Sequence, residues 1–336
     1  MSYGGERAPA GLDTSRPSVA RMYDYYLGGK DNFQVDRDAV DRVEKAMPGT
    51  RQVAHQNRAF LRRAVRYMAR QGVRQFIDIG SGLPTAGNTH GIAQEVDPSA
   101  RVAYVDNDPV VLNHGRALLA ADSRTTVATA DMHRPDEVLE HPEVTRLIDF
   151  GRPVGVPMIA MVHFLTLEEQ PYVMGRLHDA LGPGSHFTAT HATTDGLPAD
   201  MVAQTEAVYA TTPTPIHFRP RAEIARFFDG FELAPPGLVM LNEWRPRDAA
   251  TSSAVPGRQE IRVRTGTPSP QRSTSTTPIT RAAPRSRNAA KRRCAVDSLT
   301  PQARTTRCHG ARPSSWSATI TWPSTSPSCV SSTMGP

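Results

Sequence analysis

A buried strand that runs directly into a glycine-rich turn is the feature that most constrains how this chain can fold. Residues 76–82 read Phe-Ile-Asp-Ile-Gly-Ser-Gly. Gly80 and Gly82 lack a Cβ atom, so the backbone there can adopt positive φ and approach a ligand closely. In a parallel sheet, such a turn holds a nucleoside-bearing cofactor above the carboxyl ends of the strands.

Acidic residues at the ends of predicted strands indicate which cofactor this is. Asp78 lies two residues before the first glycine, Asp106 ends the next apolar strand, and Asp131 follows a third strand. A dinucleotide site needs a third glycine for close helix packing over a pyrophosphate, but Leu83-Pro84 stands here instead. S-adenosylmethionine (SAM) has no phosphate, so the pattern favours SAM over NAD.

Each of these acids has an expected contact with SAM. The carboxylate of Asp106 can accept two hydrogen bonds from the ribose diol. Asp131 can accept the adenine amino proton while Met132 packs on the ring face, and Asp78 stands near the ammonium group. The alternative is that these strand ends are polar simply because they reach solvent. The predicted cofactor-binding residues are Asp78, Gly80, Ser81, Gly82, Asp106, Asn107, Asp131 and Met132, together with Tyr26 and Lys30 from the N-terminal region.

Strand and helix patterns alternate through most of the chain. Strands are predicted at 75–79, 102–106, 126–130, 157–163 and 185–191, and helices at 88–96, 109–121, 135–149 and 168–181. This alternation predicts an α/β fold with a Rossmann-like, doubly wound and mostly parallel sheet. Three earlier helices, at 18–27, 36–46 and 53–71, predict an N-terminal helical lid.

Several sequence blocks resemble the actinobacterial SAM-dependent methyltransferases formerly catalogued as a domain of unknown function. The blocks lie at 20–33, 57–60, 78–85, 88–90, 104–109, 130–131, 134–135, 162–164, 181–185 and 244–246. The first block is long and highly specific, whereas the glycine turn alone would be a weak signal. The resemblance covers residues 14–247 and implies a class I methyltransferase fold whose methyl acceptor is not assigned.

The block at 20–33 combines an aromatic helix with the turn Gly-Gly-Lys-Asp-Asn. N-terminal helices often close over the cofactor in this fold class. Tyr23 and Tyr26 are expected near the sulfonium, because a cation is attracted to a ring face. Lys30 and Asp31 are expected near the amino-acid end of SAM. The alternative is a helix packed on the edge of the sheet with its turn exposed.

Two residues are candidates for catalysis, His163 and Tyr23. Methyl transfer from a sulfonium is an in-line displacement, so alignment of acceptor, methyl and sulfur supplies most of the catalysis. A base is needed only if the acceptor must lose a proton. His163 follows the fourth predicted strand and could be that base, or a structural histidine that bonds a neighbouring loop. His191 is a weaker candidate, and His90 is expected to shape the cofactor loop or to cap a helix.

The charge of the chain is unevenly divided. The net charge is +6, but residues 248–336 contain 13 of the 39 lysines and arginines and 3 of the 33 acids. Residues 1–247 therefore carry 26 basic and 30 acidic side chains, a net charge of −4. This balance argues against an obligatory nucleic-acid partner. We find no signal-like or membrane-length apolar run, so a cytoplasmic protein with no membrane partner is expected.

The C-terminal segment has a different composition from the rest of the chain. Ser, Thr, Pro and Arg dominate residues 248–336, and Phe and Tyr are absent there. Such a segment cannot bury enough apolar surface to offset its ordering entropy, so it is predicted to be disordered. It also holds all three cysteines, whose spacings match no zinc motif, and no metal site is predicted.

The origin of this segment has two interpretations. One is a basic arm for an acidic partner. The preferred hypothesis is a frameshift near residues 247–255, because such composition is typical of out-of-frame translation of a GC-rich gene. The fold would then lack its last antiparallel strand, for which 259–264 is a weak substitute.

The sequence thus predicts three parts: a disordered N-terminus at 1–13, a methyltransferase domain at 14–247 and the tail at 248–336. The domain divides into a helical lid at 14–72 and a Rossmann-like core at 73–247. The predicted function is methyl transfer from SAM to a small-molecule O or N acceptor. A SAM-binding or inactive regulatory protein on the same fold is the main alternative. A nicotinamide-dependent oxidoreductase is disfavoured by the missing third glycine.

Overall fold

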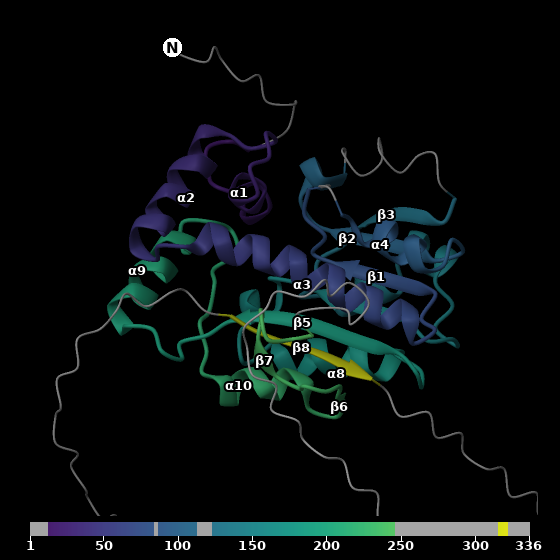
Figure 1. Cartoon of the computed structure of the whole chain (residues 1–336). Helices are drawn as coiled ribbons and strands as arrows, with labels where there is room; N and C mark the ends of the chain where they lie inside the picture. The colour runs from purple at the N-terminus through teal and green to yellow at the C-terminus, as the bar shows by residue number, and fades with distance from the viewer. Residues whose placement is uncertain (1–12, 84–86, 113–122, 246–314, 322–336) are drawn as a thin grey trace, which may run out of the picture. The chain divides into compact units, whose positions relative to one another are not determined.

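Five parallel strands form the centre of the structure (Figure 1), as the alternating pattern predicted. The computed structural model describes residues 13–83, 87–112, 123–245 and 315–321. The parallel strands are β1 (Gln75–Ile79), β2 (Arg101–Asp106), β3 (Thr125–Thr129), β4 (Gly155–Met158) and β5 (His186–Ala192). Their order in the sheet is β3-β2-β1-β4-β5. Because β2 and β4 flank β1 on opposite sides, the winding reverses there, and a crevice is expected outside the carboxyl ends of these strands.

Helices cover both faces of this sheet. They are α3 (Thr50–Arg70), α4 (Thr89–Val96), α6 (Pro135–Leu139), α7 (Pro142–Leu147) and α8 (Gln170–Ala180). Phe76 and Val102 pack with residues of α3 and α4, whereas Ile77 and Ala103 belong to a second core cluster with α6, α7 and α8. Consecutive side chains of a strand point to opposite faces, so strands buried on both sides read as continuous apolar runs.

Two further helices, α1 (Val19–Tyr26) and α2 (Gln34–Ala46), precede α3. They pack on each other, and α2 also packs on α9 (Ala199–Tyr209), which lies far along the chain (Figure 1). A buried ion pair joins α1 to α2. Arg21 Nε donates to Asp36 Oδ2 at 2.8 Å, and the two side chains are 3% and 0% exposed. Removing one partner of such a pair leaves an uncompensated buried charge, so this contact fixes the two helices together.

The predicted strand at 157–163 is wrong at its C-terminal end. After β4 the chain leaves the sheet. The Ala160 N–H donates to the side-chain Oγ1 of Thr190 at 2.8 Å instead of to a carbonyl of a neighbouring strand, and Ala160 has a φ of 57°. His163 therefore lies in a short 3-10 helix, η1 (Val162–Phe164).

The predicted helix at 135–149 is interrupted. It is split into α6 and α7, because a residue before proline is disfavoured in helical conformation. His141, which precedes Pro142, has φ −57° and ψ 131°. Its ring instead accepts a hydrogen bond from the Glu143 N–H, so the break begins the next helix.

The strand that closes the sheet comes from the C-terminal segment. β8 (Ser315–Thr321, yellow in Figure 1) runs antiparallel to β5, from the pair His186 and Thr321 to the pair Ala192 and Ser315. It also pairs with β6 (Glu232–Leu233) and β7 (Val239–Met240), which follow α10 (Arg221–Ala225) and η2 (Arg226–Phe228).

The prediction that all of 248–336 is disordered is therefore wrong for residues 315–321. Backbone pairing with β5 orders these residues, and composition carries no information about such a long-range pairing. Several predicted segments lie outside the described residues, namely 1–12, 113–121 of the predicted helix at 109–121, the substitute strand at 259–264 and the rest of the tail.

Candidate functional site

The carboxyl ends of the parallel strands open into a cavity of about 520 Å³. This volume is in the range of small-molecule and cofactor sites. The cavity lining includes these predicted site residues: Tyr23, Tyr26, Asp78, Gly80, Ser81, Gly82, Asp106, Asn107, Asp131, Met132 and His163. We call the part around Asp78, Asp106 and Asp131 the acidic half. We call the part around His163, His191 and Tyr209 the aromatic half.

The glycine turn lines the acidic half. Gly80 and Gly82 have φ values of 71° and 62°, so the positive φ expected from the sequence is confirmed. The Gly80 N–H donates to the carbonyl of Val105 at 2.8 Å, which ties the turn to β2. A Cβ atom at Gly80 would lie 2.1 Å from Met161 Sδ. A larger residue would therefore have to displace this neighbour, so the glycine allows Met161 to pack closely against the turn.

Asp106 joins the glycine turn to the loop after β2. Its Oδ2 accepts from the Gly82 N–H and its Oδ1 from the Asp108 N–H, both at 2.9 Å. Burial raises the pKa of Asp106 to about 6, although these backbone N–H groups act in the opposite direction. Each carboxylate oxygen has two acceptor positions, so Asp106 can still accept hydrogen bonds from ligand hydroxyls.

Asp78 lies at the end of β1, under the same turn. Thr89 Oγ1 donates to its Oδ2 at 2.6 Å. Burial raises the pKa of Asp78 to about 6, while the hydrogen bond from Thr89 and the charge of Arg58 lower it. The acidic half therefore holds two buried carboxyl groups that ionise at a higher pH than an exposed aspartate does.

Asp131 and Met132 follow β3 on the far side of the acidic half. Asp131 Oδ1 accepts from the His133 N–H at 3.0 Å and lies 2.6 Å from the His133 ring nitrogen Nδ1. Burial acts to raise the pKa of Asp131, but these contacts outweigh it and the pKa is lowered. Met132 is buried, whereas Asn107 is exposed at the rim. The chain thus sets an ionised carboxylate beside an apolar side chain.

Lys30 does not line the cavity with the other predicted residues. The turn that carries it folds back on α1, because Asp24 Oδ2 accepts from the Asp31 N–H at 2.9 Å and from Asn32 Nδ2 at 2.8 Å. Lys30 is exposed at that turn. It is not placed to contact a ligand in this cavity.

Arg58 of α3 is a lining residue that the sequence reasoning did not select. It is half-buried, and its Nη2 donates to Asn88 Oδ1 at 3.3 Å. Arg58 belongs to the block at 57–60, which contributed to the family resemblance. Nothing in that block showed which strand end Arg58 would face.

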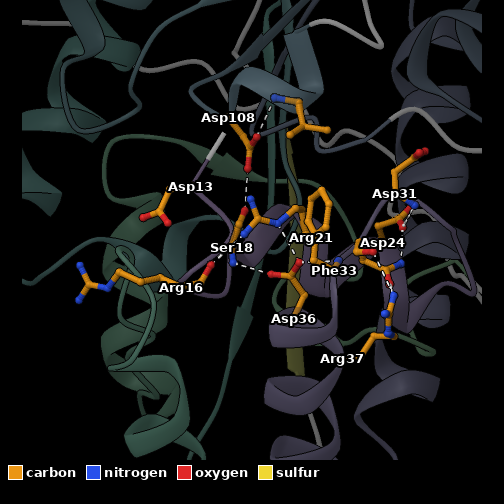
Figure 2. A network of polar contacts seen from close by, with 12 residues as sticks. Asp13, Arg16, Ser18, Arg21, Asp24, Asp31, Phe33, Asp36, Arg37 and Asp108 are labelled. Carbon is orange, nitrogen blue, oxygen red and sulfur yellow. Dashed lines mark hydrogen bonds and ion pairs between the residues drawn. The ribbon is translucent and has the colours of Figure 1, made fainter. Parts of the chain in front are cut away.

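Ser18 connects the N-terminal helices to the loop after β2 (Figure 2). Its Oγ donates to Asp108 Oδ2 at 2.6 Å, and its N–H donates to Asp36 Oδ1 at 2.9 Å. Because the Asp108 N–H donates to Asp106, hydrogen bonds lead from the buried Arg21–Asp36 pair to the acidic half. No sequence signal marked this contact, whose partners lie 90 residues apart.

His163 lies in the wall of the aromatic half. It is 8% exposed, and its Nδ1 has no hydrogen-bond partner among the described residues. Its ring stands edge-on to Phe164 and His191, with centroids 4.4 Å and 5.8 Å away. Burial lowers the pKa of His163 to about 3, and the charges of Arg219 and His217 add to this. The imidazole is therefore neutral, and its buried Nδ1 keeps an unused hydrogen-bonding position.

Three tyrosines line the same half. Tyr23 Oη donates to the carbonyl of Ala54 at 3.3 Å, and Tyr26 Oη lies 3.5 Å from Tyr209 Oη. Burial raises the pKa of Tyr23, Tyr26 and Tyr209 above the usual range. All three phenols therefore keep their protons near neutral pH.

Both ring nitrogens of His191 have partners. Arg219 Nη1 lies 2.8 Å from Nε2, and the carbonyl of Ala192 lies 2.6 Å from Nδ1. His90 lies outside the cavity lining and contacts Tyr104 Oη through Nδ1 at 2.7 Å. Of the three histidines considered from the sequence, His163 has a buried ring nitrogen without a hydrogen-bond partner among the described residues, whereas both ring nitrogens of His191 are engaged.

The described part of the chain contains no group of three or more His, Cys, Asp or Glu side chains arranged to hold a metal ion. None of the helices described here is both long and apolar enough to span a membrane.

Comparison with known families identifies the chain. Residues 5–267 match the model of a family described as S-adenosyl methyltransferase. The chain belongs to this family. The chain is also similar to a candidate methyltransferase from Thermobifida fusca YX, solved as a crystal structure. That protein is 45% identical, with a TM-score of 0.68, over 74% of this chain and 93% of its own.

A second crystal structure, of a DUF574 family protein from Streptomyces avermitilis MA-4680, is 40% identical. Its TM-score is 0.67, and the match covers 73% of this chain and 94% of that one. No curated protein matches the chain. The family match and the similar structures show that the chain is a SAM-dependent methyltransferase with the class I fold. The sequence resemblance had implied the same family and fold.

The acidic half fits SAM in both shape and chemistry. The backbone of the glycine turn lines the cavity at Gly80 and Gly82, and Asp106 offers acceptors beside it. Asp131 and Met132 supply an acceptor and an apolar surface at the next strand end. Arg58 and Asp78 provide one charge of each sign near the turn. This is the set of groups needed by a ligand with a diol, a purine and an amino acid.

Proposed function

We propose that this enzyme methylates an oxygen or nitrogen atom of a small molecule held in the aromatic half of the cavity. One observation carries the proposal: a single cavity continues from the strand-end acids to His163 and the tyrosines. A cofactor and an acceptor can therefore meet inside the chain without a macromolecular partner. When bound, SAM supplies an activated methyl group on its sulfonium.

The residues of the acidic half would hold the cofactor in a fixed orientation. Asp106 would accept from the ribose hydroxyls, and Asp131 from the adenine amino group beside Met132. Asp78 would face the ammonium, and Arg58 would pair with the carboxylate in place of Lys30. Asn107 and the backbone at Gly80, Ser81 and Gly82 would complete the contact. Such positioning converts a bimolecular displacement into an effectively unimolecular one.

The aromatic half would orient the acceptor. Tyr23 and Tyr26 present ring faces that attract a cation, which suits the neighbourhood of a sulfonium. His163 would hydrogen-bond the acceptor group. The buried position of His163 excludes water from that contact.

A turnover assay tests the proposal. The full chain is incubated with SAM and a panel of small phenols, carboxylic acids, alcohols and amines, and release of S-adenosylhomocysteine is measured. We expect release that depends on the acceptor and that falls in a His163→Ala variant with unchanged SAM binding. Tight SAM binding with no acceptor-dependent release, including with a small-molecule cell extract, would favour the regulatory alternative instead.

A further inference from the structure

We propose that the aromatic half selects an acidic oxygen acceptor, such as a phenol, enol or carboxylic acid, and that the enzyme methylates it as the anion. This inference rests on the proposed function and names its substrate class. It starts from the distribution of charge along the cavity. Every carboxylate among the described lining residues belongs to the acidic half or to the segment at 13–18 and 106–108 beside it. The described wall of the aromatic half has none, so it offers no carboxylate that would form an ion pair with an ammonium group.

A buried cation stands behind that wall. Arg219 is 4% exposed, and its guanidinium is always protonated in a protein. Its Nη2 donates to the carbonyl of Leu165 at 2.6 Å and its Nη1 contacts His191. Both partners are neutral, and no described carboxylate lies within ion-pair distance of it. Its charge therefore gives the adjoining cavity a positive potential.

Acids do act on Arg219 from farther away. Glu168, Glu206 and Glu223 raise its pKa, while burial lowers it more strongly. Glu168 is exposed, and the other two are partly exposed, so solvent screens their charges. A buried charge is screened much less. The field at the cavity wall is thus dominated by the guanidinium.

The contact with Arg219 also fixes the state of His191. A guanidinium can only donate, so His191 Nε2 must accept, and the proton of the neutral ring is on Nδ1. Nδ1 then donates to the carbonyl of Ala192 at 2.6 Å. Both nitrogens are used, so His191 cannot remove a proton from an acceptor. Arg219 is accordingly a positioning residue, which acts through His191 and through its charge.

The remaining candidate base is weak. Burial, Arg219 and His217 hold the pKa of His163 near 3, so it has little tendency to take a proton from an alcohol or an ammonium. The backbone N–H of His217 donates to the carbonyl of His163 at 2.8 Å, which holds the two residues side by side. An acceptor that is already ionised needs no strong base. The unpartnered Nδ1 of His163 can instead donate to it.

The two hydroxyls of Tyr26 and Tyr209 supply a second donor. They lie 3.5 Å apart, and whichever hydroxyl donates, the other keeps its own proton for a ligand. Burial raises the pKa of both, so neither competes with the acceptor for the anionic state. A donor held toward a developing or existing oxyanion stabilises it without reorganisation.

The step balances in charge and atoms. The acceptor proton passes to solvent buffer before attack, and the oxyanion lone pair forms the new O–CH₃ bond. The S–CH₃ bond breaks as this bond forms, and its electron pair stays on sulfur. The products are a neutral methyl ether or ester and neutral S-adenosylhomocysteine.

The test uses 4-nitrophenol, whose anion absorbs visible light and which ionises near neutral pH. It is titrated by pH with the full chain saturated with S-adenosylhomocysteine, which fills the cofactor site without turnover. We expect the bound probe to favour the phenolate by at least about tenfold over the free probe, a downward shift of about one pKa unit. Arg219→Met should abolish this shift, and Arg219→Lys should keep part of it. Arg226→Met, which removes an exposed arginine of η2, is the matched control and should leave it unchanged.

Circular dichroism and S-adenosylhomocysteine binding verify that each variant is folded. If Arg219→Met does not fold, the wild-type shift and Arg219→Lys still decide the question. The inference is overturned if the bound probe keeps its ordinary pKa, if it does not bind, or if benzylamine binds as tightly as the phenolate. Failure of S-adenosylhomocysteine to bind at all would instead overturn the proposed function.

Discussion

The two halves of the cavity are built in different ways. In the acidic half, the carboxylates lie at the carboxyl ends of parallel strands or just after them, and backbone N–H groups hold them in place, as at Asp106. In the aromatic half, the wall combines side chains of α1, η1 and α9 that are distant in the sequence. The first half can be built from local motifs, and the second exists only in the folded chain. The difference teaches that the proposed cofactor site follows from the fold class, whereas the proposed acceptor site depends on how this chain packs its N-terminal helices and later loops.

The largest effect is expected at the buried ion pair between α1 and α2, the helices that carry part of the cavity wall. Asp36 is fully buried and accepts from Arg21, Ser18 and Phe33. Asp36→Ala leaves the Arg21 charge buried and should lower the free energy of unfolding by about 3–5 kcal/mol. Chemical denaturation followed by circular dichroism measures this. Asp38→Ala, on the exposed side of the same helix, is the control and should change it little. Equal stability of both variants would show that the lid does not depend on this pair.

A comparison of Arg58 and Lys30 tests which of the two basic residues contacts SAM in the acidic half. Arg58 lines the cavity and Lys30 does not. Loss of one charged hydrogen bond is worth about 1.5–3 kcal/mol, so Arg58→Ala should weaken SAM binding by about 10- to 100-fold. Lys30→Ala should leave it unchanged. Calorimetric titration of SAM into both variants separates them, and the reverse ranking would restore Lys30 as the carboxylate partner.

The pH dependence of SAM binding probes the buried acids directly. Burial raises the pKa of Asp78 and of Asp106 from 3.8 to about 6, and binding needs their charged forms. SAM affinity should therefore rise as pH increases toward 6 and level off above it, by up to about tenfold per pH unit for each group. In the free protein the sign is opposite. Because the folded state keeps these protons longer than the unfolded chain, stability falls as pH rises from about 4 to about 6. Calorimetry between pH 5 and 8 measures the first effect, and a flat profile would contradict it.

The smallest effect is expected at Ser18. Ser18→Ala removes the hydrogen bond from Oγ to Asp108 but keeps the backbone contact with Asp36. One such bond is worth about 1 kcal/mol, so SAM binding should weaken by about fivefold. Ser15→Ala, whose Oγ contacts only the exposed Asp13 in the described residues, is the control. No change in affinity would mean that the lid and the cofactor loop are not coupled through this contact.

The sequence predicted the parts of the molecule that depend on local pattern. The parallel sheet follows from alternating strands and helices, and the positive φ of Gly80 and Gly82 follows from the missing Cβ. The strand limits at β4 could not be predicted, because the chain leaves the sheet through a contact with Thr190, which lies on another strand. The strand β8 was missed for the same reason: its order comes from pairing with β5 and not from its own composition.

The acceptor side was the least predictable part of the site. His163 was selected from its place after a strand, but its unpartnered nitrogen is a property of the packed wall. Arg219 carried no signal at all, since its importance comes from burial beside His191. Lys30 was selected because it follows an aromatic helix, yet hydrogen bonds to Asp24 turn that segment away.

The most direct test of this account is a calorimetric titration of SAM into the full chain and into Asp106→Ala, with the exposed Asp229→Ala as a matched control. Asp106 holds the glycine turn and the following loop together at the centre of the acidic half. The account predicts measurable SAM binding in the wild type and in the control, and binding weaker by at least about 100-fold in Asp106→Ala. Equal SAM affinity in all three proteins would contradict the assignment of the cofactor to this cavity.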